Sequence, residues 1–103
     1  MIRHIVMWRL KSRLAQGERS EVTARLEQNL ASLRAAVPGL LQAWTGWNEA
    51  ETADASDLVL YTEFSSWDAL RGYESHPMHD ELRAIIGPLR SERRVVDFEV
   101  RES

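Results

Sequence analysis

Residues 2–10 of the chain read IRHIVMWRL, a run of apolar and β-branched residues broken by basic ones. Successive side chains of a strand point to opposite sides of its sheet, so the run divides into two faces. One face carries Ile2, His4, Val6, Trp8 and Leu10. The other carries Arg3, Ile5, Met7 and Arg9. Both faces hold apolar side chains, which is typical of a strand covered on both sides. We expect helices over the first face and a second copy of the sheet over the other.

Beyond this strand the apolar spacing lengthens and predicts an amphipathic helix over about residues 18–37. Its core face consists of Val22, Leu26, Leu30, Leu33 and Val37. Pro38 and Gly39 should end this helix, because proline disfavours a helical conformation in the preceding residue and glycine lets the chain turn.

The remaining sequence predicts three more strands and a pair of short helices. The expected strands are residues 40–48, bent at Gly46, 58–64 and 93–101. The expected helices run from Ser65 to about Glu74, and from Pro77 until Gly87 and Pro88 weaken the pattern. This order is the β-α-β-β-α-β ferredoxin-like arrangement, an α+β fold with a four-stranded antiparallel sheet and helices on one face. We expect a single domain over residues 1–103.

The composition of the chain excludes several kinds of partner and of functional site. Thirteen basic and sixteen acidic side chains give a net charge of −3, which provides no general attraction to nucleic acid or an anionic membrane. The chain has no cysteine, which excludes disulfides, thiolate catalysis, iron–sulfur clusters and thiolate zinc sites. The first residues are too short and too charged a run for a signal peptide or membrane span, so we expect a cytoplasmic protein. No phosphate-binding loop, nucleophile elbow or paired carboxylate motif occurs, and we expect no cofactor.

Three segments look like a known family: IRHIVMW at 2–8, FSSWDAL at 64–70 and YESHPMH at 73–79. Together with the Pro38-Gly39 turn and the closing residues 96–98, they resemble the stress-responsive A/B barrel (Dabb) family across nearly the whole chain. The resemblance implies a homodimeric α+β barrel. One branch of that family, the plant olivetolic acid cyclase, closes a linear polyketide by aldol chemistry without metal or cofactor.

The similarity to this cyclase branch implies catalytic roles for Tyr73 and His79 and a place in the pocket for His4. The third-strand histidine of the cyclase has no counterpart, because Leu58 stands there. The sequence therefore predicts a small apolar pocket between sheet and helices, lined by His4, Val6, Trp8, Tyr73 and His79. His76 is a further substrate-binding candidate or a residue that fixes the helix junction. His76 and His79 without a third ligand do not make a metal site, so we expect no metal.

The expected positions of Tyr73 and His79 are consistent with acid/base roles but leave the direction of the His79 pKa shift open. His79 would be the third residue of its helix, near free backbone N–H groups that disfavour imidazolium. Asp80 and Glu81 act in the opposite direction, so the direction of its pKa shift is undecided. The Tyr73 phenol could donate a hydrogen bond to a carbonyl as negative charge develops there.

Each candidate also has a purely structural interpretation. His4 can be a hydrogen-bonded core residue, and Tyr73 can pack under a helix. We expect Trp8 and Trp67 in the core, while Trp44 and Trp47 can line a cavity or a dimer contact. The arginines near the end of the chain, interspersed with acidic residues, are typical of a solvated helix face. They are Arg83, Arg90, Arg93 and Arg94.

Two functions remain: a cofactor-independent enzyme acting on a small carbonyl or aromatic compound, and a non-catalytic stress-responsive or binding homodimer.

Overall fold

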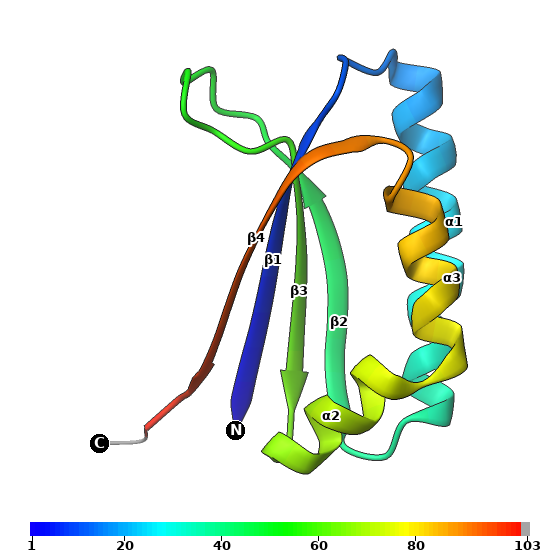
Figure 1. The fold of residues 1–103 in the computed structure, drawn as a ribbon, viewed down its shortest axis with the longest axis vertical. Coiled ribbons are helices and arrows are strands. Elements are labelled where there is room, and N and C mark those ends of the chain that lie inside the picture. Colours follow the sequence, from blue (N-terminus) through cyan, green and yellow to red (C-terminus); the bar gives the residue numbers. More distant parts are fainter. Residues whose placement is uncertain (102–103) are drawn as a thin grey trace.

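The computed structural model describes residues 1–101, which form a four-stranded antiparallel sheet with helices on one side (Figure 1). The strands are β1 (Ile2–Leu10), β2 (Leu40–Trp47), β3 (Leu58–Phe64) and β4 (Arg90–Glu99). The helices are α1 (Gln16–Ala36), α2 (Trp67–Ser75) and α3 (Pro77–Ile86). The strand order β2-β3-β1-β4 and the element order confirm the ferredoxin-like fold. The last two residues of the expected domain, 102–103, lie outside the described residues.

β1 is a central strand that pairs with β3 on one side and β4 on the other. Its side chains alternate as predicted, and Ile2, His4, Val6 and Trp8 are all buried on the helix side. This face joins the apolar residues of α1, β3 and α3 in one core. Among the described helices, none is long and apolar enough to cross a membrane.

Several element boundaries differ from the predicted ones. α1 begins at Gln16 because the Glu18 carboxylate accepts a hydrogen bond from the Ala15 N–H at 2.9 Å, which satisfies a free donor at the helix start. β4 begins at Arg90 rather than Arg93, since its pairing with β1 continues past a register shift near Leu10. The irregularity of β2 lies between Leu40 and Gln42, so the expected bend at Gly46 is wrong.

The four tryptophans occupy different environments. Trp8 is in the core as predicted, but Trp67 is 40% exposed, and its core assignment is wrong. Trp67 is the first residue of α2, one turn before the buried Leu70. Trp47 is half-buried and donates its indole N–H to the Thr23 hydroxyl at 2.8 Å, which ties β2 to α1. Trp44 is exposed on the other side of the sheet.

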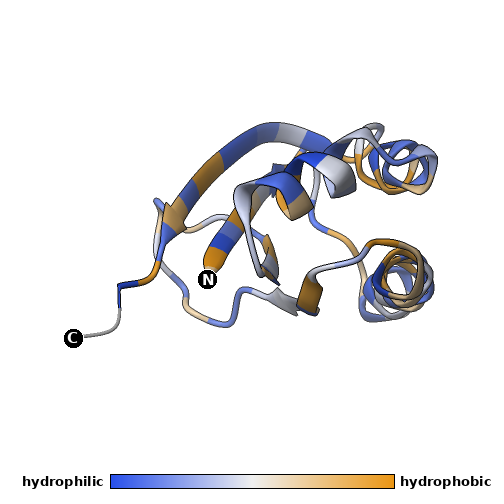
Figure 2. Ribbon diagram, turned by 90° about the horizontal axis from the view of Figure 1, so that it is seen from below, coloured by the Kyte–Doolittle hydropathy of each residue, from blue (hydrophilic) through white to orange (hydrophobic). Residues whose placement is uncertain are grey.

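The sheet face opposite the helices is uncovered and rich in apolar side chains. We call it the outer face. Seen from below, the helices lie on one side of the sheet (Figure 2). Met7, Trp44, Val96 and Phe98 are each at least 39% exposed. Trp44 packs on Tyr61 with a ring-centre distance of 4.4 Å. An apolar area of this kind marks an interaction surface.

Gly39 allows the turn between α1 and β2. Its φ of +87° favours glycine, and an added Cβ would lie 2.5 Å from the Ser65 Oγ and 2.7 Å from the Ala69 Cβ. We expect Gly39→Ala to lower the free energy of unfolding by about 2 kcal/mol or more in urea titrations. Gly72→Ala is the control, because nothing lies within 4 Å of the added Cβ in this helix, and it should stabilise by about 0.5–1 kcal/mol. Equal stability of the two variants would contradict the assignment.

Candidate functional site

A cavity of about 410 Å³ lies between α3 and the helix side of β1 and β4. We call it the inner cavity. Its apolar wall is formed by Val6, Trp8, Leu60, Leu82 and Ile86. His4 and His79 also line it, as predicted. The remaining wall is charged rather than apolar, which differs from the expected small apolar pocket. It contains Glu74, Arg83, Arg90 and Arg93.

Short local motifs bring Tyr73 and His79 together across the break at Pro77. The Ser66 hydroxyl accepts from the Ala69 N–H at 3.1 Å and starts α2, which carries Tyr73 inward. Pro77 starts α3, and His79 is the third residue of that helix, as expected. The two rings lie edge to face with their centres 4.7 Å apart.

Both groups lack a hydrogen-bond partner for a buried polar atom. Among residues 1–101, nothing bonds to the Tyr73 hydroxyl or to His79 Nδ1. Tyr73 is fully buried and does not line the inner cavity, so its expected place on the wall is wrong; it packs directly behind His79. An unpaired buried polar atom is costly, so this pair is a functional candidate.

Burial determines the protonation of the pair. It lowers the pKa of His79 to about 4, and the positive charge of Arg83 adds to the effect, while Asp80 opposes it. The question left open by the sequence is thereby answered in favour of neutral imidazole. Burial, with a contribution from Glu74, raises the pKa of the Tyr73 phenol well above its usual range. At neutral pH the site therefore holds one proton acceptor and one protonated donor.

Sequence reasoning missed Asp97, which completes the site from β4. Its carboxylate bonds to His4 Nδ1, and the two residues are directly opposite in the β1–β4 register. His4 is 1% exposed and also lies 6.0 Å from Tyr73 between ring centres. A carboxylate on one ring nitrogen fixes the orientation of an imidazole and directs the other nitrogen elsewhere. Only the alternation of β4 could have indicated Asp97, because its partner is 93 residues away.

His76 is not brought to the inner cavity. Its Nδ1 accepts a hydrogen bond from the Met78 N–H at 3.1 Å, so it caps α3 at the helix junction. This is the structural alternative stated for it above, and the substrate-binding prediction has no support from its position. In the described part of the chain, no group of three or more His, Cys, Asp or Glu residues could hold a metal ion.

A family model described as the stress responsive A/B barrel domain, Dabb, matches residues 2–100. The chain belongs to the Dabb family. Comparison with curated proteins gave no match.

Solved structures similar to this Dabb chain share its fold. A dimeric protein of unknown function from Bacteroides fragilis superposes with a TM-score of 0.80 at 24% identity, over 96% of this chain and 95% of the other. A dimeric ferredoxin-like protein of unknown function from Thermobifida fusca has a TM-score of 0.78 and 28% identity, over 96% and 90%. The hydroxynitrile lyase of Passiflora edulis has a TM-score of 0.76 and 21% identity, over 99% and 94%. Dimeric proteins and an enzyme are thus among its neighbours.

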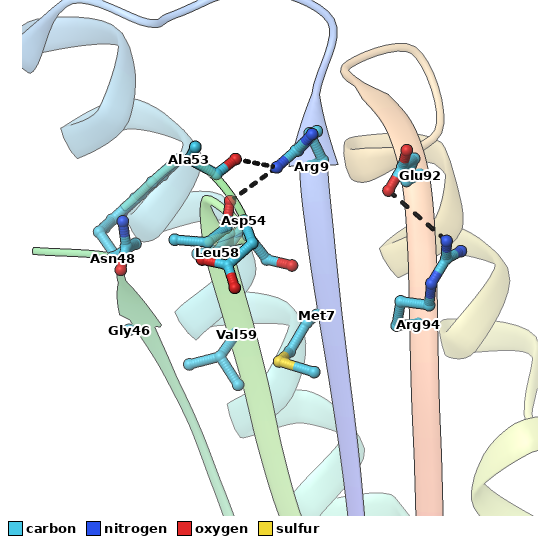
Figure 3. Close-up of a pocket in the computed structure, with 13 residues that line it drawn as sticks. Met7, Arg9, Gly46, Asn48, Ala53, Asp54, Leu58, Val59, Glu92 and Arg94 are labelled. Carbon is cyan, nitrogen blue, oxygen red and sulfur yellow. Dashed lines mark hydrogen bonds and ion pairs between the residues drawn. The ribbon is translucent and has the colours of Figure 1, made fainter. Parts of the chain in front are cut away.

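The outer face of the Dabb sheet has a larger groove of about 820 Å³, beside the loop after β2 (Figure 3). Both of its arginines have partners within the chain. Arg9 donates to the carbonyls of Ala53 and Ala55, and Arg94 lies 3.8 Å from the Glu92 carboxylate. Met7 and Val59 form its apolar floor. The unpartnered pair is elsewhere, with His79 on the wall of the inner cavity and Tyr73 behind it.

The low pKa of His79 predicts an acid-sensitive fold. His79 takes up a proton near pH 6.5 in the unfolded chain but only near pH 4 in the folded one. The unfolded state therefore binds the proton first, so the free energy of unfolding is unaffected by His79 above pH 6.5 and decreases as the pH falls from 6.5 to 4. Urea unfolding should show the Dabb chain losing up to about 3 kcal/mol more over this interval than His79→Asn. His4, Arg83, Arg93 and Asp80 act electrostatically on His79 and are retained in the variant, so the comparison isolates the contribution of the His79 ring. Parallel pH curves for the two proteins would disprove the assignment.

Proposed function

We propose that this Dabb chain is a single-domain homodimer in which each protomer holds a cofactor-independent acid/base site for a small carbonyl or aromatic compound. The observation that carries the proposal is the unpartnered pair of Tyr73 and His79 beside the inner cavity, with buried polar atoms that nothing in residues 1–101 satisfies. A ligand oxygen and an acidic C–H or O–H group would satisfy both atoms.

The proposed chemistry is proton transfer next to a carbonyl. Neutral His79 takes a proton from carbon and the C–H electrons move to the carbonyl oxygen. The Tyr73 hydroxyl, which lies behind His79, would donate a hydrogen bond to the oxyanion once the bound substrate displaces the His79 ring. The enolate then attacks a second carbonyl, whose oxygen takes the proton held by His79, or the enolate carbon regains that proton. His4, oriented by Asp97, lies close enough to Tyr73 to contact the same substrate. The hydroxynitrile lyase among the structural neighbours supports an acid/base reaction on this fold.

Turnover assays on compounds selected by a ligand screen test this role. The screen should include β-polyketones, aromatic aldehydes and a hydroxynitrile. We expect conversion to survive chelation with EDTA and to fall at least about a hundredfold in both Tyr73→Phe and His79→Asn. Tyr61→Phe is the matched control, because it removes a hydroxyl that bonds Glu63 outside the inner cavity.

The alternative is a non-catalytic binding homodimer, which the complete burial of Tyr73 favours. Under this alternative the screen yields ligands that bind and are not converted. Conversion that is indifferent to both substitutions would remove the acid/base assignment.

The proposed dimer joins the outer faces of two sheets around a two-fold axis. Ile5 and Val96 are opposite each other in the β1–β4 register, and they lie beside exposed Met7 and Phe98. The dimeric neighbours support this assembly. An isologous contact would cover the apolar stripe of both copies at once.

Adjacent valines on β4 provide a matched test of the dimer. Val96 faces outward opposite Ile5, and Val95 faces inward opposite Val6, yet they are 49% and 47% exposed. We expect sedimentation at micromolar concentration to show twice the 11.9 kDa of the chain, with Val96→Arg becoming monomeric and Val95→Arg remaining dimeric. A monomeric unsubstituted protein would exclude the dimer, and the reverse pattern would place the interface elsewhere.

A further inference from the structure

Three arginines meet at the charged wall of the inner cavity, although only one of them is on a helix. Arg83 is on α3, whereas Arg90 and Arg93 are on β4, where they are opposite Leu10 and Trp8 of β1. The four arginines expected on a solvated helix face are exposed, but Arg90, Arg93 and Arg94 lie on β4, so the helix assignment is wrong for these three. The register turns Arg93 to the helix side of the sheet, next to the titratable groups.

These arginines differ in what neutralises them. Arg83 is paired with Asp80 at 3.0 Å. Within residues 1–101, no carboxylate lies within 4.0 Å of the side-chain nitrogens of Arg90 or Arg93.

The outer face shows the opposite pattern. Arg3 lies 3.6 Å from the Glu63 carboxylate, Arg94 lies 3.8 Å from that of Glu92, and Arg9 donates to loop carbonyls. Each of these outward arginines thus has a carboxylate or carbonyl partner within 4.0 Å, whereas no carboxylate of residues 1–101 comes that close to the inward guanidinium of Arg93.

The positive charge of the arginines also affects the proposed acid/base pair. Arg83 and Arg93 both act electrostatically on Tyr73 and His79. An anion near these groups is therefore favoured. Glu74 is the one carboxylate lining the inner cavity, and it disfavours a second negative charge on the same ligand. The opposite wall, with Val6 and Trp8, is apolar and suits a hydrocarbon or aromatic body.

We propose that the inner cavity binds a small aromatic or largely apolar molecule bearing a single carboxylate, with the carboxylate on Arg93 and Arg90 and the body against Trp8. A guanidinium binds a carboxylate through two parallel hydrogen bonds, which gives orientation as well as affinity. The inference rests on the proposed function, because it names the substrate class of that site.

A matched pair of probes tests the charge requirement without any turnover. 2-Naphthoate and 2-naphthamide share one ring system and differ in charge, so their dissociation constants are compared by calorimetry at pH 7.5. We expect naphthoate to bind at least about fivefold more tightly than naphthamide. Raising the salt concentration to about 0.5 M should weaken the binding of naphthoate and leave that of naphthamide unchanged.

Single substitutions assign the preference to the arginines. Arg93→Gln should weaken naphthoate binding about fivefold, the double variant Arg90→Gln/Arg93→Gln should abolish the preference, and neither should change naphthamide binding more than about twofold. Arg34→Gln is the control, because it removes the same charge from the exposed last turn of α1. Circular dichroism and the amide region of NMR spectra should be used to check that each variant is folded.

Equal binding of the two probes, equal weakening by Arg34→Gln and Arg93→Gln, or no naphthoate binding up to millimolar concentration would overturn the inference. Its failure is distinct from that of the proposed function. Arginine-dependent binding with no compound converted would refute the enzyme and leave the carboxylate site. Conversion of neutral compounds alone, without carboxylate binding, would refute the carboxylate site and leave the acid/base pair.

Discussion

The alternation of β1 is the constraint on which the molecule depends. β1 is hydrogen-bonded on both edges, so its register with β3 and β4 determines which side chains of three strands face the helices. One phase places His4, Val6 and Trp8 inward. A slip of one residue would reverse this and place Arg3, Met7 and Arg9 in the core. The core and the inner cavity are therefore specified by one pairing pattern.

The residues at and behind the inner cavity have to meet two requirements that oppose each other. The core needs apolar contact, and Tyr73 meets that need by packing on Phe64 at 5.2 Å between ring centres. The proposed proton transfer needs polar atoms that are free to change partners, and the Tyr73 hydroxyl has no hydrogen-bond partner among the described residues. Burial of such atoms reduces stability, and the apolar packing around them offsets this cost.

The sequence predicted the fold well because its signals are local. Periodicity located the elements, and the Pro77 break showed how Tyr73 and His79 converge. The contact of Asp97 with His4 and the position of Arg93 at the inner cavity were not predicted, because both depend on the pairing of two strands that are far apart in the sequence. Trp67 was misplaced for a related reason: a large apolar residue at a helix start looks like a core residue until the path of that helix is known.

The pairing of β1 with β4 joins the first ten residues to the last part of the described chain. β1 is synthesised before β3 and β4, so both of its edges are hydrogen-bonded only after these two strands have been made. Such distant pairings make folding slow and leave an unpaired apolar strand exposed in the meantime. His4 thus obtains its carboxylate partner only after β4 has been made and paired, so this contact forms together with the sheet.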